Sequence, residues 1–380
     1  MSSATRDASG LLRLQTSADG RSGWTFVTEP KISHGPAYEV RVVPGTGMMG
    51  MFAARDLAAG ERLISEAPLA RWAVRAGSSR EERIRSFAET VVDFTPQQTA
   101  KLLALSEAGH FSKVKGKRTL MGTWLTNALP INYEDGQGGS SSSGADHEEE
   151  AAVFETICRI NHACSPSCHH EWNPALGTET VHALKSIPRG SELSISYLMP
   201  AGRTRAERQE RLSRQFGFEC TCSLCSLAGE ALARSDACQR AIGDVSEPPR
   251  GLALPELLKR LQIRLAFMAK EGMPDVWARP LLVSAMVQSV QDASAEGRQR
   301  SHQLADRASA CVKLSTGDDH PAYQTVSTFI SVVEKFESEH GGQAGLAAAL
   351  AGGQQGVGSA ASAASTERAA AASTSRRKKK

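Results

Sequence analysis

The segment Phe216-Gly217-Phe218-Glu219-Cys220-Thr221-Cys222-Ser223-Leu224-Cys225 carries three cysteines in C-x-C-x-x-C spacing. Thiolates this close can share one tetrahedral zinc ion, but a closed structural site needs four protein ligands. A fourth ligand must therefore come from a distant part of the chain, which the metal would fix to this segment. The best source is Asn161-His162-Ala163-Cys164, and within and beside it His162 and Cys168 compete with Cys164 for the fourth place.

The composition is that of a globular protein. The chain has 380 residues, of which 41% are hydrophobic and 22% charged, enough for one large domain or two ordinary ones. Its formal net charge of +3 is too small to indicate nucleic-acid binding by itself. The polar N-terminus lacks a signal-peptide pattern, and no apolar run is long enough to span a bilayer. We therefore expect reduced thiols, and we interpret Cys158, Cys238 and Cys311 as buried thiols because they lack ligand spacing.

Hydrophobic periodicity predicts a mixed α+β chain. Strands are expected within 38–68, 167–172, 179–183 and 192–197, and helices at 79–94, 96–110, 119–129 and across 229–338. Thr204-x-x-Glu207 is a capping box that opens a further helix running to about Phe216. Residues 1–20 and 136–150 are polar and low in complexity, which predicts a disordered leader and a mobile surface loop.

The C-terminal residues from about 341 are rich in Ala, Gly and Ser and end in a basic run at 376–380. This composition predicts a disordered tail. The basic run is typical either of a nuclear import or nucleic-acid signal or of a solvated tail, and the sequence does not distinguish between them.

Gly45-Thr46-Gly47-Met48-Met49-Gly50 matches the G-x-G-x-x-G pattern of dinucleotide-binding sites. Such a site needs a helix to begin at the glycines, so that the helix N-terminus faces the pyrophosphate. Here Gly60 follows soon after, and no convincing βαβ unit is evident. We therefore reject a dinucleotide site and expect these glycines to let the backbone approach a ligand closely or to form a tight turn.

Four segments, in order, resemble the SET-domain lysine methyltransferases, most closely the SMYD-like and related fungal SET proteins. They are residues 45–47 followed by FAARDLAAGERLI, RINHACSP at 159–166, GSELSISY ending at Tyr197, and FGFECTCSLC at 216–225. The match covers roughly residues 38–226. It implies an α+β SET fold, in which several small sheets surround a pseudoknot formed where residues 161–164 pass beneath a later loop.

The resemblance also implies a division of the chain around a two-part SET core. The expected parts are a disordered leader (1–25), the SET N-terminal part (26–69), a variable helical insert (70–153) with the low-complexity loop (136–150), the SET C-terminal core (154–200), a post-SET helix and zinc loop (201–228), a helical extension (229–340) and a disordered tail (341–380).

The resemblance assigns roles to single residues. Tyr197 corresponds to the catalytic tyrosine. Asn161 and His162 correspond to the pair that holds S-adenosylmethionine, and Phe218 to the aromatic that stacks on its adenine. Phe216 corresponds to a position in the lysine channel, although plain core packing explains this residue equally well. The opposite wall of the cofactor site would be Gly45, Thr46, Gly47 and Met48, and the zinc ligands would be Cys164, Cys220, Cys222 and Cys225.

The chain departs from the family pattern in two places. Relatives usually carry N-H-S-C-x-P-N, whereas this chain has Ala163 and, at the last position, Ser167. The missing asparagine puts the hydrogen bonding of the knot region in doubt. Residues 69–153 contain no cysteine, so the zinc-binding MYND module that SMYD proteins insert there is absent.

The function implied by the resemblance is S-adenosylmethionine-dependent methylation of lysine side chains on a protein substrate, histone or other, in the nucleus or cytoplasm and with a structural zinc. Two alternatives stay open: a catalytically weak SET protein that acts as a chromatin- or protein-binding scaffold, and a zinc-stapled helical protein that binds partners through 229–338. Cofactor binding and turnover distinguish the three. The sequence does not name the substrate, the methylation state or the oligomeric state.

Overall fold

The computed structural model of the chain describes residues 12–16, 22–26, 36–111, 118–131, 148–198, 202–244, 252–271, 278–292 and 294–340. The strands are β1 (Leu12–Thr16), β2 (Ser22–Phe26), β3 (Tyr38–Val42), β4 (Met49–Ala53), β5 (Arg62–Glu66), β6 (Ala70–Arg75), β7 (Leu129–Pro130), β8 (Glu148–Val153), β9 (Asn161–His162), β10 (Cys168–Asn173), β11 (Thr178–Ala183) and β12 (Ser194–Ile195). The helices are α1 (Arg80–Val92), α2 (Pro96–Leu103), α3 (Leu120–Asn127), the 3-10 turn η1 (Ile157–Arg159), α4 (Arg205–Phe216), α5 (Gly229–Asp244), α6 (Leu254–Lys270), α7 (Ala278–Gln291), α8 (Ala295–Thr316) and α9 (Pro321–His340).

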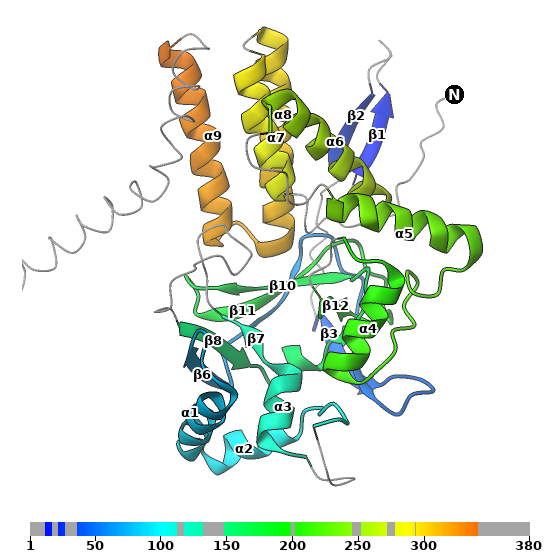
Figure 1. The fold of residues 1–380 in the computed structure, drawn as a ribbon, viewed down its shortest axis with the longest axis vertical. Helices are drawn as coiled ribbons and strands as arrows, with labels where there is room; N and C mark the ends of the chain where they lie inside the picture. Colours follow the sequence, from blue (N-terminus) through cyan, green and yellow to red (C-terminus); the bar gives the residue numbers. More distant parts are fainter. Residues whose placement is uncertain are drawn as a thin grey trace, which may run out of the picture.

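Small sheets occupy the middle of the molecule, with helices on both sides (Figure 1). The described strands pair as β1–β2, β3–β4, β10–β11–β5, β6–β8–β7 and the parallel pair β9–β12. Four of these sheets share one hydrophobic core, in which Phe154, Ile157 and Ile160 are fully buried on the approach to β9. Backbone hydrogen bonds between sheets, such as Leu193 N to Met51 O at 2.8 Å, join them into one body.

The predicted insert forms a second small core of α1, α2 and α3 against β6–β8–β7. Ser79 and Thr95 cap α1 and α2 through reciprocal capping boxes, which satisfy the unpaired amides of each first turn. The rings of Trp72, Phe87 and Trp124 meet edge to face, with centroids 5.3 to 6.2 Å apart. This aromatic triad fixes the helices to the sheet.

Two expectations of disorder are wrong in part. Within the predicted leader, β1 and β2 pair as an antiparallel hairpin, and the alternating sequence LRLQT explains why a strand forms there. Within the predicted loop 136–150, residues 148–150 belong to β8 and pair with β6. Ion pairs to arginines of the insert, Arg83–Glu149 at 2.8 Å and Arg71–Glu150 at 3.6 Å, offset the low strand propensity of glutamate. The remainder of that loop, 136–147, and the tail 341–380 lie outside the described residues.

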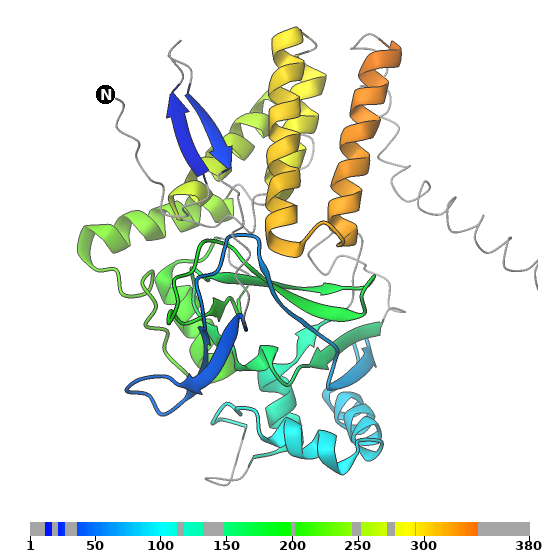
Figure 2. The ribbon, with the colours of Figure 1, turned by 180° about the vertical axis from the view of Figure 1, so that it is seen from behind.

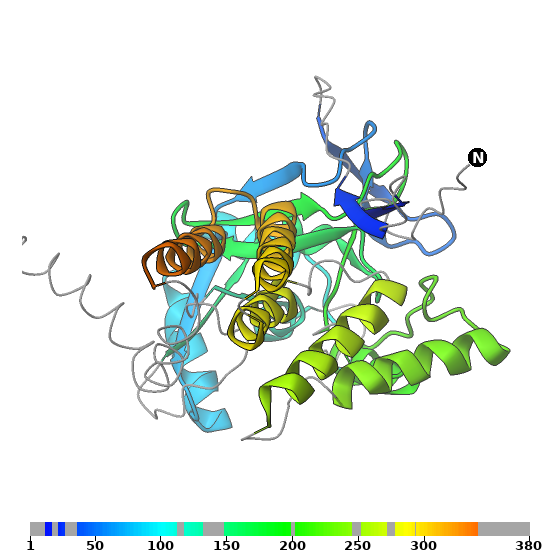
Figure 3. The ribbon, with the colours of Figure 1, turned by 90° about the horizontal axis from the view of Figure 1, so that it is seen from above.

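The region predicted to be a helical extension forms α5 to α9. Helix α8 packs against β10 and β11, and α7 and α9 pack against α8, an arrangement that Figures 2 and 3 show from behind and from above. The turn between α8 and α9 docks on the sheet, where Asp319 forms an ion pair with Arg62 and His320 Nε2 lies 3.0 Å from Trp172 O. Next to this contact, His182 is 1% exposed and its Nε2 accepts a hydrogen bond from Arg62 Nε at 3.1 Å.

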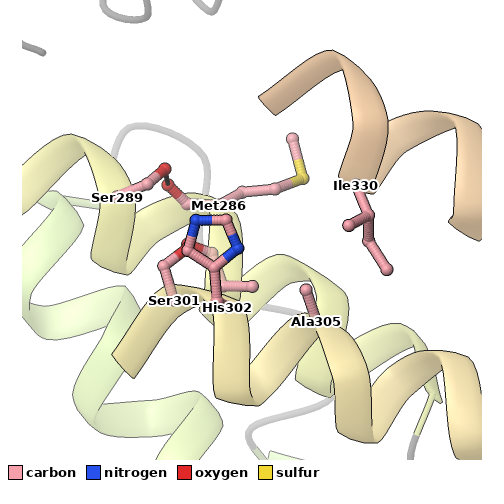
Figure 4. A pocket seen from close by; sticks show the side chains of 7 residues that line it. Met286, Ser289, Ser301, His302, Ala305 and Ile330 are labelled. Carbon is pink, nitrogen blue, oxygen red and sulfur yellow. Dashed lines mark hydrogen bonds between the residues drawn. The ribbon is translucent and has the colours of Figure 1, made fainter. Parts of the chain in front are cut away.

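A cavity of about 10 Å³, the size of one water molecule, lies between α7, α8 and α9 and is lined by Met286, Ser301, His302 and Ile330, among others (Figure 4). None of the residues singled out by the sequence lines it. No helix in the described ranges is both long and apolar enough to cross a membrane.

Candidate active site and cysteine cluster

The strand pair β9–β12 brings two sequence motifs side by side. Asn161 lies opposite Ser194 and His162 lies opposite Ile195 in a parallel register. Ile160, Leu193 and Ile195 are at most 2% exposed and hold both strands in the core. Because Tyr197 follows β12 closely, it lies beside His162, and its backbone N donates a hydrogen bond to His162 Nδ1 at 3.0 Å.

A hydrogen bond of the hydroxyl and a contact of the ring fix the Tyr197 side chain. Its hydroxyl donates a hydrogen bond to Ile160 O at 2.7 Å, and its ring centroid lies 5.3 Å from that of His162. Burial, with a smaller effect of the nearby Glu192 carboxylate, raises the pKa of Tyr197. The phenol therefore stays protonated at neutral pH, so it can orient a reacting group by hydrogen bonding but does not act as a base.

Helix α4 and the turn that follows it place two more aromatic side chains beside His162 and Tyr197. The predicted capping box between Thr204 and Glu207 opens the helix, and Gly217 ends it in the left-handed conformation with φ 75°. This turn brings Phe218 back over the site, with ring centroids 6.1 Å from His162 and 6.4 Å from Tyr197. Phe216 lies 5.0 Å from Tyr197. The four rings, all half-buried, form one aromatic wall.

Asn161 is anchored through its amide nitrogen. Its Nδ2 donates hydrogen bonds to Met49 O at 3.2 Å and to Glu192 Oε1 at 2.8 Å. Within the described residues its Oδ1 forms no hydrogen bond, so this oxygen is available to a ligand. Gly50 permits the close approach, because a Cβ there would lie 2.9 Å from Asn161 Nδ2. The sequence prediction missed Glu192, whose only signal is its place within GSELSISY.

The predicted cofactor wall at 45–48 lies at the exposed tip of the β3–β4 hairpin. Gly45 and Gly47 have φ 77° and 70°, and Thr46 Oγ1 accepts a hydrogen bond from Met48 N at 3.1 Å, so the segment is a tight turn. A strand, β4, follows the glycines in place of a helix, in agreement with the rejection of a dinucleotide site. The structure brings Met49 and Gly50 to Asn161; no hydrogen bond within the described chain joins the tip itself to Asn161.

The cysteine cluster consists of Cys164, Cys220, Cys222 and Cys225, whose sulfurs all lie within 4.8 Å of one another. Cys164 Sγ is 4.0 Å from Cys220 Sγ and 3.4 Å from Cys225 Sγ. In a tetrahedral Zn–S₄ site with bonds of about 2.3 Å, the sulfurs lie about 3.8 Å apart. Hydrogen bonding within the cluster lowers the pKa of Cys222 and raises that of Cys164, because sulfurs this close together do not all lose their protons without a cation. The four sulfurs therefore fit a zinc ion.

The alternatives for the fourth ligand are placed differently. Cys168 begins β10 and is buried in the main core beside Ser167, outside the cluster. His162 Nε2 lies 3.3 Å from Cys164 Sγ, but its other ring nitrogen accepts the Tyr197 amide, so it neighbours the cluster without joining it. Of the cysteines predicted as buried thiols, Cys311 is buried, and Cys158 and Cys238 are half-buried.

Ser167, at the position where relatives usually carry asparagine, is hydrogen-bonded to β12. Ser194 N donates to Ser167 Oγ at 2.9 Å, and Ser167 N donates to Ser194 Oγ at 3.1 Å. Because Ser194 lies in β12, this reciprocal pair ties the segment after Cys164 to the strand that leads to Tyr197.

Comparison with known proteins agrees with this geometry. The SET domain family model matches residues 48–198. The chain is 31% identical over 190 residues to histone-lysine N-methyltransferase set5 of Schizosaccharomyces pombe, covering 50% of each protein. It is 36% identical over 78 residues to histone-lysine N-methyltransferase ASHR1 of Arabidopsis thaliana, covering 20% of this chain and 16% of that protein. It is 35% identical over 79 residues to histone-lysine N-methyltransferase SMYD3 of Homo sapiens, covering 20% and 18%.

The chain thus matches about half the length of set5 and under a fifth of the other two relatives. Among solved structures, the SET domain of LSMT bound to lysine and AdoHcy aligns with 80% of this chain and 89% of that chain, but at a TM-score of 0.25 and 11% identity, which is too distant to support an argument. Together these comparisons show that residues 48–198 match the SET domain family, and that the chain is similar over part of its length to the Set5 and SMYD lysine methyltransferases.

Proposed function

We propose that this protein transfers a methyl group from S-adenosylmethionine to a lysine side chain of another protein. The observation that carries the proposal is the convergence of Tyr197, the Asn161-His162 pair and Phe216 and Phe218 on one half-buried aromatic site. Residues 48–198, which match the SET domain, and the segment that follows them form this site together. The relatives named as histone-lysine N-methyltransferases support the same reaction class.

The proposed cofactor site lies between Asn161, His162 and Phe218. S-adenosylmethionine supplies an electrophilic methyl group on a sulfonium. The unengaged Oδ1 of Asn161 is an acceptor for a cationic amine, and the half-buried ring of Phe218 is a surface on which a purine can stack. Met49 and Gly50, which contact Asn161, would form the opposite wall, with Gly45, Thr46, Gly47 and Met48 at its outer edge.

In this proposal Tyr197 and Phe216 line the lysine channel. Methyl transfer requires a neutral amine, and an apolar channel favours loss of the lysine proton by removing the ammonium from water. The aromatic faces also attract the methylated cation. The phenol of Tyr197, kept neutral by burial, would orient the amine and the methyl group by hydrogen bonding and would not take up the proton itself.

The cysteine cluster is proposed as a structural zinc site in a post-SET loop. Its four thiolates leave no coordination position for substrate, as in other closed structural sites. The contact of Cys164 with the 220–225 segment and the parallel pairing of β9 with β12 support a threaded arrangement of the pseudoknot type. The expected boundaries of the leader, insert, SET core, post-SET part and helical extension remain proposals of the same kind.

Histones are the first substrates to test, because the matched relatives are named for histone lysine, and nuclear as well as cytoplasmic action is proposed. The second candidate function is a protein-binding scaffold with weak activity. It is favoured by the large helical region α5–α9, which accompanies the SET domain without supplying any of its site residues.

A methyl-transfer assay with radiolabelled S-adenosylmethionine tests the proposal on purified histones and on a protein extract. We expect labelled protein with the wild-type chain and at least a hundredfold less with Tyr197→Phe. Cofactor binding without any labelled product on either substrate source would favour the scaffold instead.

A further inference from the structure

Arg208 is a buried cation next to the cysteine cluster. It lies one turn into α4 and is only 4% exposed. Its Nη1 donates a hydrogen bond to Arg203 O at 2.7 Å, and its Nη2 points to Cys225 Sγ at 3.8 Å. Its Nε is buried without a hydrogen-bond partner. We propose that Arg208 is the counter-charge of the four-cysteine centre and determines how tightly that centre holds zinc.

The charge of Arg208 requires an anion nearby. A guanidinium does not lose its proton in proteins, and burying it without a partner costs several kcal/mol. Within the described chain no carboxylate forms an ion pair with Arg208, and the neighbouring Glu207 is engaged in the capping box with Thr204. Its guanidinium contacts Cys225 Sγ, which becomes an anion when the cysteine binds zinc as a thiolate.

The charge of the cluster requires a cation. Four thiolates and one Zn²⁺ carry a net double negative charge, in a place where Cys164, Cys220 and Cys225 are each at most 5% exposed. His162 offers Cys164 a hydrogen bond from Nε2, since its Nδ1 accepts the Tyr197 amide, but this neutral tautomer adds no charge. Arg208 therefore supplies the charge that the histidine does not.

This inference rests on the proposed zinc site. Partners beyond the direct ligands change metal affinity by about 10- to 100-fold when they are removed. We expect an effect of that size here, because Arg208 contributes a full charge at low exposure.

The test compares zinc affinity of the full chain and its variants by competition with a chromophoric chelator. Arg208→Met keeps an unbranched apolar stem and removes the charge, and Arg211→Met is the matched control because Arg211 is exposed on the same helix. We expect a 10- to 100-fold loss of affinity in Arg208→Met, an intermediate loss in Arg208→Lys and a change of less than about twofold in Arg211→Met.

The free energies of unfolding of the zinc-loaded protein and of the chelator-treated protein separate a counter-charge role of Arg208 from a merely structural role. If Arg208 only supports the Arg203 carbonyl, Arg208→Met and Arg208→Lys will lose the same stability with and without zinc, which overturns the proposal. If it is the counter-charge, the loss is confined to the loaded form. Should Arg208→Met fail to fold, Arg208→Lys decides by the same comparison. Wild-type protein that binds no zinc overturns the proposed centre itself, whereas equal affinity of wild type and Arg208→Met overturns only the role of Arg208.

Discussion

Replacing Tyr197 by Phe tests the site most directly, because it removes one oxygen atom and leaves the ring. The hydroxyl's 2.7 Å hydrogen bond to Ile160 O is lost, at a cost of about 1 kcal/mol in the free energy of unfolding. The ring contacts with Phe216 at 5.0 Å and His162 at 5.3 Å remain, as does the hydrogen bond from the Tyr197 amide to His162. The fold and the cofactor site should therefore survive.

The rate of methyl transfer should fall much further than stability. A single positioned hydrogen-bonding group that acts in the transition state is worth on the order of a hundredfold in rate. Affinity for S-adenosylmethionine should stay within about threefold, because Asn161 and Phe218 are unchanged and the phenol is not proposed to bind the cofactor.

Two measurements made in parallel check this prediction. Initial rates of methyl transfer test the expected loss of turnover, and calorimetric titration with S-adenosylmethionine tests the expected retention of cofactor affinity. Tyr38→Phe is the matched control, because Tyr38 packs against the same core from β3 and the change removes the same group. Wild-type rates in Tyr197→Phe would refute the catalytic assignment. A similar loss of rate in Tyr38→Phe would attribute the effect to general destabilisation.

Three further predictions concern stability and metal. Burial, reinforced by the cation Arg62, lowers the pKa of His182 to about 3, so only the unfolded chain binds a proton at this histidine as the pH falls below about 6.5, and the folded state loses stability. Between pH 7 and pH 5 the free energy of unfolding in urea should fall by about 2 kcal/mol more in the wild type than in His182→Gln. Equal losses in the two proteins would contradict this prediction. Cys222→Ser should release zinc and lower the melting temperature by several degrees, measured by elemental analysis and calorimetry; a wild type that contains no zinc would rule out the structural role. Replacing 137–146 by a short linker should change the melting temperature little, because loop-closure entropy varies slowly with length. A deletion that extends through 148–150 removes half of β8 and should lower the melting temperature by several degrees. Equal effects of the two deletions would show that β8 is misassigned.

Local sequence determined the features that depend on neighbouring residues. The capping box of Thr204 and Glu207 begins α4 where predicted, because both partners lie within one turn of the helix. The C-x-C-x-x-C segment places three cysteines within six residues, so one metal ion can bind all three without help from the rest of the chain. The order and spacing of the four SET-like segments pointed to the SET domain, and the family model matches residues 48–198, which include the segments around Asn161 and Tyr197.

Tertiary structure alone decided which distant groups meet. Cys164 joins the cluster and Cys168 does not, because the chain enters β10 between them and turns Cys168 into the core. The composition of the segment that contains the glutamates at 148–150 predicted a loop, yet these residues form a strand. They do so because β6 supplies backbone hydrogen bonds and arginines of the insert supply the opposite charge. Arg208 has no local signal, since only the folded chain places its guanidinium beside Cys225. Contacts of this kind depend on packing between segments far apart in the chain, which no local pattern encodes.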